Sequence, residues 1–396
     1  MRKKQLLFMI INMNVGGTEK ALLNMLEQLP PENYNITLLM LEEYGGFMNQ
    51  IPRHVTIEYV IDYPGMKELI NKPLLHVALR SLKKWELGKF IKASSLYIGS
   101  KLLQDRTFLY QTILKDYPQT AKTYDIAVAY AGPMDFISYF VLKKIKAANK
   151  LQWVHFDITK IGFNCTFASK MYPYFDKIYA VSKQARNNLV HALPHLEEKT
   201  AVFYNLVSAQ SVMNQSREGR GFSDPFEGIR ILTIGRLSIE KGQDLAIRAL
   251  DRLIQDGYKV KWYCVGEGSS RKELEKLIAE FDLQEHFILL GSNPNPYPYL
   301  AQCDLYVQPS RHEGYCITLN EARCLNKPIV TTDFNGAREQ ITDGSTGSIV
   351  AINEYEIYIA VKQLLDNPAL RSNYIKNLAN DAKRTATSGI AHKIIF

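Results

Sequence analysis

Along this chain, short apolar runs alternate with longer stretches in which apolar residues recur every three or four positions. A short, continuous apolar run is typical of a buried strand, whereas the longer period is typical of an amphipathic helix. Alternation of the two predicts a parallel sheet built from strand–helix units. The pattern therefore indicates an α/β protein.

In the first half of the chain, this alternation covers residues 1–205. The predicted strands are residues 5–12, 36–41, 55–60, 125–130, 151–155, 177–181 and 201–205, and the clearest helix is 18–29. Residues 206–228 follow, rich in Ser, Gln, Gly and Arg, which favours a linker. We expect residues 1–205 to form one Rossmann-like domain.

The second half repeats the alternation more clearly, and residues 229–375 are predicted to form a second doubly wound domain. Its strands are predicted at residues 229–235, 260–266, 287–291, 304–309, 328–332 and 348–350. Its helices are predicted at 242–256, 271–281, 317–325 and 355–365, and a last helix at 368–385. Two such domains facing across a cleft would bind a ligand at the carboxyl ends of their strands.

Length and composition limit the class of protein. The chain has 396 residues, 46% apolar and 22% charged, which favours two globular domains. No run reaches the roughly 18 uncharged apolar residues of a membrane-spanning helix. The basic start and apolar residues 6–11 lead into Asn12 and a glycine pair, which favours a first strand over a signal peptide.

Cysteine usage indicates a reducing compartment. The five cysteines are Cys165, Cys264, Cys303, Cys316 and Cys324, and they include no C-x-x-C pair. An odd, scattered set argues against a disulfide framework and against a zinc site. The cytoplasm is the expected location.

The net charge of +8 is unevenly distributed. Residues 67–115 carry ten Lys and Arg residues against three acidic ones, interleaved with apolar side chains. This pattern is typical of a basic amphipathic helix on an anionic membrane surface, here the inner face of the cell membrane. A solvated helical face is the alternative. No recognition motif indicates a nucleic-acid partner.

The segment ILTIGRLSIEKGQDLAIRAL places two cations after a predicted strand. Arg236 and Lys241 lie in the short loop before a helix. An Arg fork, a Lys point charge and a helix N-terminus together suit a diphosphate. A solvated loop is the alternative.

The segment VQPSRHEGYCITLNEARCLNKPIV places two carboxylates around the start of the next helix. Glu313 is followed by Gly314, and the amides of Tyr315, Cys316 and Ile317 are the orphan donors of the predicted helix start. Such a carboxylate can accept bonds from sugar hydroxyls. Glu321, within the helix, can accept bonds from two ribose hydroxyls.

Three further motifs follow predicted strands and carry weaker signals. Gly16 and Gly17 allow close backbone approach to a ligand. Gly266 and Gly268 around Glu267 suit approach to a nucleotide base, and a plain turn is the alternative for both glycine pairs. His155 and Asp157 end an apolar run, and alone His155 is interpreted as a structural histidine.

The order of these motifs resembles a known family. It runs GG-T-E, H-x-D, GR-L…EKG, VGEG, PS-x-x-EGY…EA and KPIV. This order is similar to the family-4 group of retaining glycosyltransferases with the GT-B fold. The resemblance covers nearly the whole chain, strongly over residues 229–350 and thinly over 45–125.

The resemblance implies a site for a nucleotide-diphosphate sugar, with uridine the expected base. Arg236 and Lys241 would neutralise the leaving diphosphate, so no divalent metal and no cofactor are expected. Glu313 would hold the donor sugar, assisted by the backbone at Tyr315 and Cys316, and Glu321 would bind the ribose.

The resemblance also implies roles for the first half of the chain. Gly16 and Gly17 would approach the donor phosphate and the acceptor, and His155 would lie beside the reacting sugar. The anomeric configuration would be retained. The C-terminal helix, about residues 376–396, would pack back on the first domain.

Three positions depart from the family pattern. Cys316 and Asn326 stand where a glycine is usual, and Cys316 would narrow the sugar pocket. The stretch after Thr332 keeps only a loose likeness, although Glu339 matches the usual acid there. None of these changes removes a proposed catalytic group.

The leading hypothesis is therefore a hexosyltransferase-type enzyme that acts on a glycan or lipid-linked acceptor in surface-polysaccharide or glycolipid biosynthesis. A nucleotide-sugar epimerase on a similar fold is one alternative, and it would show no dependence on an acceptor. A sugar phosphorylase would need a lysine in a setting for pyridoxal phosphate, and the sequence shows none. A non-catalytic partner of another transferase is the last alternative.

Overall fold

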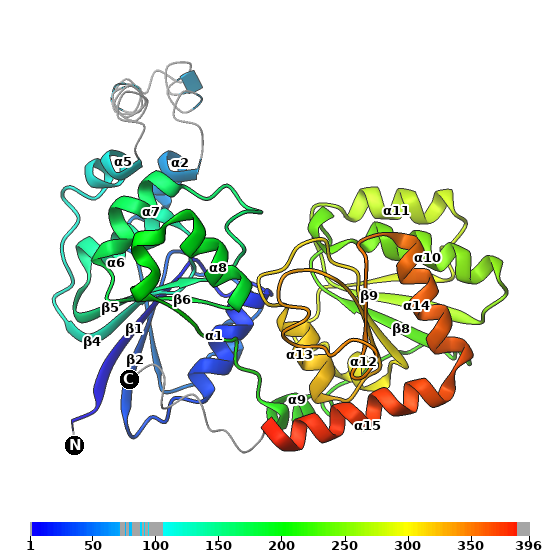
Figure 1. The fold of residues 1–396 in the computed structure, drawn as a ribbon. Helices are drawn as coiled ribbons and strands as arrows, with labels where there is room; N and C mark the ends of the chain where they lie inside the picture. The colour runs from blue at the N-terminus through cyan, green and yellow to red at the C-terminus, as the bar shows by residue number, and fades with distance from the viewer. Residues whose placement is uncertain are drawn as a thin grey trace. The chain divides into compact units, whose positions relative to one another are not determined.

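The computed structural model describes residues 2–71 and 106–385, together with positions 76, 79, 80, 88, 91 and 94. Contacts between Cα atoms divide the chain into two compact units. The first comprises Met1–Met13 and Leu29–Phe203, and the second comprises Asn14–Gln28 and Tyr204–Phe396. Figure 1 shows the elements of both.

The first unit is built, within the described residues, on a seven-stranded parallel sheet in the order β3-β2-β1-β4-β5-β6-β7. Its strands are β1 (Lys4–Ile10), β2 (Tyr34–Met40), β3 (Val55–Tyr59), β4 (Thr123–Ala129), β5 (Lys146–Val154), β6 (Lys177–Ala180) and β7 (Thr200–Val202). Its helices are α2 (Tyr63–Asn71), α5 (Arg106–Ile113), α6 (Asp135–Lys144), α7 (Cys165–Met171) and α8 (Lys183–Ala192), with 3₁₀ turns η1 (Met48–Gln50), η2 (Tyr172–Tyr174) and η3 (Pro194–Lys199).

The second unit contains, within the described residues, a six-stranded parallel sheet in the order β10-β9-β8-β11-β12-β13. Its strands are β8 (Ile229–Ile234), β9 (Val260–Val265), β10 (Phe287–Gly291), β11 (Leu305–Gln308), β12 (Ile329–Thr332) and β13 (Ser348–Val350). Its helices are α1 (Gly17–Glu27), α9 (Ala209–Gln215), α10 (Gln243–Gln255), α11 (Arg271–Glu280), α12 (Tyr297–Gln302), α13 (Ile317–Cys324), α14 (Glu354–Asp366) and α15 (Pro368–Thr385), with a 3₁₀ turn η4 (Ile239–Lys241).

Both faces of the second sheet are covered by apolar side chains. Ile231 belongs to a core cluster shared with α10 and α14, whereas Leu232 belongs to one shared with α12 and α13. Successive side chains of a strand point to opposite faces of the sheet, so a continuous apolar run is buried on both faces. The carboxyl ends of β8, β9 and β11, which carry the candidate site, therefore lie at one edge of a rigid layer.

The predicted fold class, two Rossmann-like α/β domains, is confirmed. The strands predicted at residues 287–291 and 348–350 coincide with β10 and β13. The segment 206–228, expected as a linker, contains the helix α9 and clusters with the second unit. The reason is that α9 buries Val212 in the core cluster that α12 and α13 share.

Two predictions reach beyond the described residues. Most of the basic part of 67–115 lies outside them, so the predicted membrane-binding helix is not described. Residues 386–396 lie outside them too, and packing of the C-terminal helix on the first domain stays a prediction. Among the helices that the structure does describe, none combines the length and the hydropathy needed to cross a bilayer.

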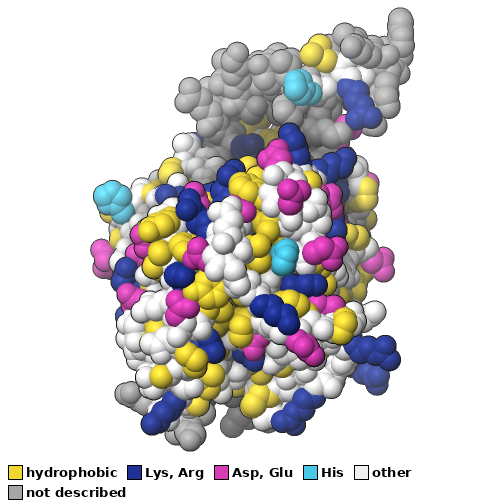
Figure 2. Space-filling view, turned by 90° about the vertical axis from the view of Figure 1, so that its right-hand side faces the viewer, with side chains coloured by type: hydrophobic (Ala, Val, Ile, Leu, Met, Phe, Trp, Pro, Cys, Tyr) yellow, Lys and Arg dark blue, Asp and Glu magenta, His cyan; other side chains and the backbone are white. Residues whose placement is uncertain are grey.

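One face of the molecule is seen in Figure 2, from the right-hand side of Figure 1. Acidic and basic side chains are interspersed there with apolar ones. Opposite charges at short spacing offset each other's field, and salt screens exposed charges beyond a Debye length of roughly 8 Å.

Candidate active site

The loop between β8 and α10 carries Arg236 and Lys241. Gly242, which caps α10, has a φ of +69°, and an added Cβ would lie 2.0 Å from the carbonyl oxygen of Pro309. Only a glycine permits this approach, which brings the loop against the end of β11. Lys241 is thereby placed beside the residues that follow β11.

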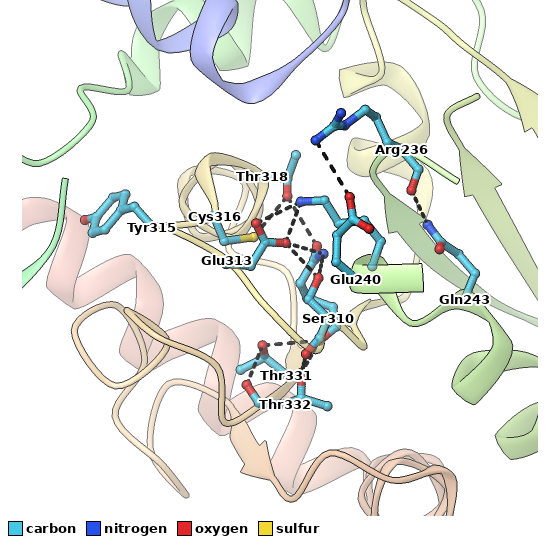
Figure 3. A network of polar contacts seen from close by, with 12 residues as sticks. Arg236, Glu240, Gln243, Ser310, Glu313, Tyr315, Cys316, Thr318, Thr331 and Thr332 are labelled. Atoms are coloured by element: carbon cyan, nitrogen blue, oxygen red, sulfur yellow. Dashed lines mark hydrogen bonds and ion pairs between the residues drawn. The ribbon is translucent and has the colours of Figure 1, made fainter. Parts of the chain in front are cut away.

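Lys241 forms an ion pair with Glu313, whose polar surroundings are shown in Figure 3. Its Nζ lies 2.6 Å from Oε1 and 2.8 Å from Oε2 of the carboxylate, so both oxygens are bound. The two side chains are 18% and 8% exposed. Burial, the largest single influence, lowers the pKa of Lys241, but the charge and hydrogen bond of Glu313, together with Cys316, raise it overall. Lys241 therefore stays charged, and the predicted cation is already paired with the predicted sugar-binding acid.

Arg236 is the more exposed of the two cations. Its Nη2 lies 3.9 Å from Oε1 of Glu240, a distance at the limit of an ion pair, and the side chain is 59% exposed. The amide of Gln243 donates to the carbonyl of Arg236 at 2.8 Å and holds the backbone of the loop. Arg236 also lowers the pKa of Lys241 through charge repulsion, which requires the two cations to lie near each other. The backbone at Arg236 is thus fixed, whereas its exposed guanidinium group can turn toward a bound anion.

The start of α13 follows Glu313 directly. Cys316 caps the helix with a φ of +59°, a left-handed conformation that is uncommon for a residue with a Cβ. The carbonyl of Tyr315 accepts a hydrogen bond from the side-chain amide of Gln340. This clamp holds the turn, and the first amides of α13, from Ile317 onward, form a helix N-terminus beside the Lys241–Glu313 pair.

Glu321 is buried one turn into α13, with 2% of its surface exposed. Its Oε1 accepts a hydrogen bond of 2.7 Å from the hydroxyl of Tyr297 on α12. Nζ of Lys20, on α1, lies 5.2 Å from the centre of the Tyr297 ring. Burial raises the pKa of Glu321, and the Tyr297 hydrogen bond and the Lys20 charge oppose that rise. The predicted ribose-binding acid is therefore held by two partners that the sequence did not indicate.

The glycine pair at the N-terminus of α1, Gly16 and Gly17, lies near the start of α13. An added Cβ on Gly17 would be 3.7 Å from Cγ2 of Ile317. An added Cβ on Gly16 would be 2.5 Å from Oε2 of Glu19. Burial raises the pKa of Glu19 to about 6, against a backbone hydrogen bond and the charge of Arg236, which lower it. The start of α1 thus brings Glu19, the acid of the GG-T-E motif to which the sequence assigned no role, close to Arg236.

The loop after β9 packs on the loop that carries Arg236. An added Cβ on Gly266 would lie 1.9 Å from the carbonyl oxygen of Gly235, and one on Gly268 would lie 2.2 Å from that of Leu237. Close packing of two backbones is thus one reason for these glycines. Glu267 between them accepts a 2.6 Å hydrogen bond from Arg271. Nucleotide-base binding by this loop stays a prediction.

His155 lies in the first unit, directly after β5. It is 6% exposed, and its ring is 4.6 Å from the ring of Tyr130, centre to centre. Burial lowers its pKa to about 3, against a hydrogen bond to the backbone of Tyr130, so the imidazole is neutral near pH 7. Its Nε2 is buried and has no hydrogen-bond partner among the described residues. A buried nitrogen of this kind is suited to a hydrogen bond from a ligand.

Asp157, the other member of that motif, has a local structural role. Its Oδ1 accepts hydrogen bonds from the backbone and hydroxyl of Thr159 and from the amide of Asn188. These bonds close the turn after β5.

The structure brings most of the predicted residues of the second unit together. Arg236, Lys241, Glu313 and the start of α13 form one neighbourhood, and Glu313 and Glu321 both act on the charge environment of Tyr306. Sequence reasoning missed Lys20 and Tyr297 and assigned no role to Glu19, because only folding brings these residues to the other groups. Among the described residues, no group of three or more His, Cys, Asp and Glu side chains is placed to hold a metal ion.

Residues 222–381 match the model of the family described as glycosyl transferases group 1. A relative from Campylobacter jejuni, an N-acetylgalactosaminyltransferase that acts on a diphospho-undecaprenol-linked substrate, is 33% identical over 54% of this chain and 58% of its own. An α-D-kanosaminyltransferase from Streptomyces kanamyceticus is 33% identical over 38% of this chain and 39% of its own. The chain thus covers about half the length of these curated relatives.

Solved structures resemble the whole chain. HepE from Anabaena, in complex with UDP and glucose, has a TM-score of 0.69 at 18% identity, over 96% of this chain and 95% of its own. A point mutant of TarM from S. aureus, crystallised with UDP, has a TM-score of 0.67 at 14% identity, over 96% of each chain. Identities this low support the fold alone. Residues 222–381 therefore resemble the glycosyl transferases group 1 family, and the solved structures share the two-domain fold of this chain.

Proposed function

We propose that the chain is a retaining, family-4 glycosyltransferase that moves a sugar from a nucleotide diphosphate to a glycan or lipid-linked acceptor. The acceptor class follows the Campylobacter relative, whose name specifies a lipid diphosphate carrier, and a capsular polysaccharide glycosyltransferase from Staphylococcus aureus. Uridine is the proposed base because HepE and TarM were both crystallised with UDP.

The observation that carries the proposal is the Lys241–Glu313 pair beside the start of α13. A leaving diphosphate develops negative charge as its bond to the sugar breaks, so cations and helix amides that already face it stabilise the transition state. Glu313 remains beside Lys241 and accepts hydrogen bonds from donor-sugar hydroxyls. The ion pair thereby binds both parts of the donor: Lys241 binds the diphosphate and Glu313 binds the sugar.

The proposed reaction breaks the bond between the anomeric carbon and the β-phosphate oxygen. The acceptor oxygen bonds to the anomeric carbon from the same face, and its proton passes to the departing phosphate oxygen. Atoms and charge balance without a covalent sugar–enzyme intermediate. Arg236 and Lys241 hold the diphosphate, so we propose that these cations take the place of a divalent metal.

His155 is proposed to accept a hydrogen bond from the reacting sugar. Its depressed pKa excludes the imidazolium form near pH 7, so it acts through the Nε2 lone pair. The remaining donor contacts are assigned to Glu321 for the ribose, to Gly16 and Gly17 for the phosphate, and to Gly314, the start of α13 and the Gly266–Glu267 loop.

We further propose that residues 1–205 hold the acceptor and that the protein works in the cytoplasm at the inner face of the cell membrane. The basis for membrane binding is the sequence of 67–115, with its excess of Lys and Arg. Co-sedimentation with anionic vesicles, with Lys83, Lys84 and Lys89 changed to Glu as the comparison, tests it. Equal sedimentation of both proteins contradicts it.

Thermal unfolding with a panel of nucleotides and nucleotide sugars tests the function directly. A ligand that binds only the folded state raises Tm by an amount that grows with the logarithm of its concentration relative to Kd. We expect UDP and at least one UDP-sugar to raise Tm, and that UDP-sugar to release UDP in the presence of an acceptor. No shift with any nucleotide diphosphate would contradict the proposal. Conversion of the UDP-sugar into an isomeric nucleotide sugar without any acceptor would identify an epimerase.

A further inference from the structure

Gln308 is the last residue of β11 and is fully buried. Tyr306 lies two positions earlier, on the same face of the sheet. The amide oxygen of Gln308 accepts hydrogen bonds from the hydroxyls of Tyr306, at 2.5 Å, and Thr318, at 3.2 Å. The amide nitrogen lies 2.8 Å from Oγ of Ser310 and 3.4 Å from Oε1 of Glu313. One buried amide thus links the strand to the proposed sugar-binding acid.

The direction of donation along this chain of hydrogen bonds is imposed by Glu313. An ionised carboxylate only accepts, so the single hydroxyl proton of Ser310 points to Oε1 of Glu313, at 2.7 Å. Oγ of Ser310 must then accept from the nitrogen of Gln308. The amide oxygen consequently faces Tyr306, which donates. Every proton therefore points toward Glu313 (Figure 3 shows Ser310, Thr318 and Glu313).

This arrangement makes the two oxygens of Glu313 unequal. Oε1 accepts from Ser310, Gln308 and Lys241, whereas Oε2, within the described part of the chain, accepts from Lys241 alone. A carboxylate oxygen offers about two lone-pair positions, so Oε1 is saturated. Oε2 retains acceptor capacity for a sugar hydroxyl.

We propose that Gln308 is a positioning residue: its oriented amide holds Glu313 by Oε1 and leaves Oε2 to the donor sugar. This role rests on the proposed function of Glu313 in donor binding. Gln308 itself does not touch the reacting atoms. It acts through Ser310 and Glu313, and its removal should lower kcat more than it weakens nucleotide binding.

Two substitutions separate positioning from packing. Gln308→Leu keeps the volume approximately and removes both ends of the amide, so Ser310 loses the donor that orients it. Gln308→Glu is nearly isosteric. When protonated, the introduced carboxyl donates to Ser310 and accepts from Tyr306 as the amide does. When ionised, it offers Ser310 no proton and repels Glu313.

The other titratable groups that face this network should not contribute to a difference in pH dependence between Gln308→Glu and the wild type. They are Tyr306 on β11, Cys316 and Glu321 around α13, and Lys241 before α10. Burial raises the pKa of Tyr306 and of Cys316, so both stay neutral at the pH of the assay. Lys241 stays charged because its pKa is raised. Burial also raises the pKa of Glu321, but Glu321 titrates in the wild type as well, so a variant-to-wild-type ratio largely cancels its effect.

The experiment compares kcat and KM for the donor between about pH 5 and 8 in the wild type, both variants and Gln255→Glu. Gln255 is exposed at the end of α10, so its substitution adds the same charge far from the network. For Gln308→Leu we expect kcat to fall about tenfold or more, with UDP affinity within about threefold of wild type. For Gln308→Glu the kcat ratio to wild type should fall as pH rises. Gln255→Glu should show neither effect.

A loss of kcat that is the same at every pH in Gln308→Glu indicates a packing role and overturns the proposal. A crystal structure of Gln308→Leu gives a readout independent of activity, because the Glu313 carboxylate should leave its place beside Ser310. An unmoved carboxylate that still accepts from Ser310 overturns the positioning role even if no nucleotide sugar is turned over. Absence of turnover in the wild type contradicts the proposed function only.

Discussion

The hydroxyl of Tyr297 donates a 2.7 Å hydrogen bond to Oε1 of Glu321, a carboxyl group that is almost fully buried. A buried acid without such a donor is costly, since water no longer solvates its charge. Tyr297 comes from α12 and Glu321 from α13, so this bond joins two helices on one face of the sheet.

Replacing Tyr297 by Phe should reduce the free energy of unfolding by about 1–3 kcal/mol at neutral pH, because the carboxylate loses a donor. The hydrogen bond opposes the burial-induced rise in the pKa of Glu321, so its loss raises that pKa further. In the folded variant Glu321 then favours its protonated form. The loss in free energy of unfolding relative to wild type should therefore grow as the pH rises above 4.5, the ordinary pKa of a glutamate. Equilibrium unfolding in urea between about pH 5 and 8 measures this. Tyr299→Phe, on the same helix, is the control, and equal deficits at all pH values would refute the explanation.

The raised pKa of Glu19 gives a second prediction. Its pKa in the folded protein is about 6, above the ordinary 4.5, so the folded state binds the proton more tightly. The free energy of unfolding should therefore fall by on the order of 2 kcal/mol as pH rises between those values. Glu19→Gln removes this dependence. The stability difference between variant and wild type should accordingly widen with pH, and parallel pH curves for the two proteins would show that Glu19 titrates normally.

His155 should titrate in the opposite sense. Its folded pKa of about 3 lies below the ordinary 6.5, so below 6.5 the unfolded state binds more protons and stability falls with falling pH. The slope is about 1.4 kcal/mol per pH unit. His155→Asn should lose less stability than wild type between about pH 7 and 5. The exposed His195 provides the control substitution, His195→Asn. The same acid sensitivity in His155→Asn and wild type would show that another group is responsible.

The strands were predicted from the sequence more accurately than the contacts between site residues were. Apolar runs such as 287–291 give strands because they are buried on both faces, and this property is visible locally. The helix α6 was missed because Phe136–Val141 are all buried and show no amphipathic period. The helix α12 was missed because prolines at 296 and 298 favour a loop, although proline is well accepted in a first helical turn.

The pairing of the site residues could not be predicted from sequence alone. Lys241 and Glu313 are 72 positions apart, and only the parallel order of β8 and β11 brings their loops together. Lys20 and Tyr297, on α1 and α12, likewise meet beside Glu321 only through the packing of helices far apart in the sequence. Gln308 looked like one polar residue at the end of an apolar run, and its role depends on the hydroxyls around it. Local sequence patterns predict which residues follow a strand, but they do not predict which residues these contact in the folded protein.

Substitution of Lys241 tests the central claim most directly. Removing one partner of a buried ion pair costs about 3–5 kcal/mol of stability, so Lys241→Met should be studied alone and combined with Glu313→Gln, which leaves no unpaired charge. Lys276→Ala, at an exposed lysine of α11, serves as the control.

The measurement is kcat for release of the nucleotide diphosphate from the donor, made on folded protein. We predict that kcat falls about 100-fold or more in both Lys241 variants, as expected for loss of a preorganised charge at the leaving group, while Lys276→Ala stays near wild type. A folded Lys241→Met protein, or the charge-balanced double variant, that turns over at nearly the wild-type rate would contradict the account.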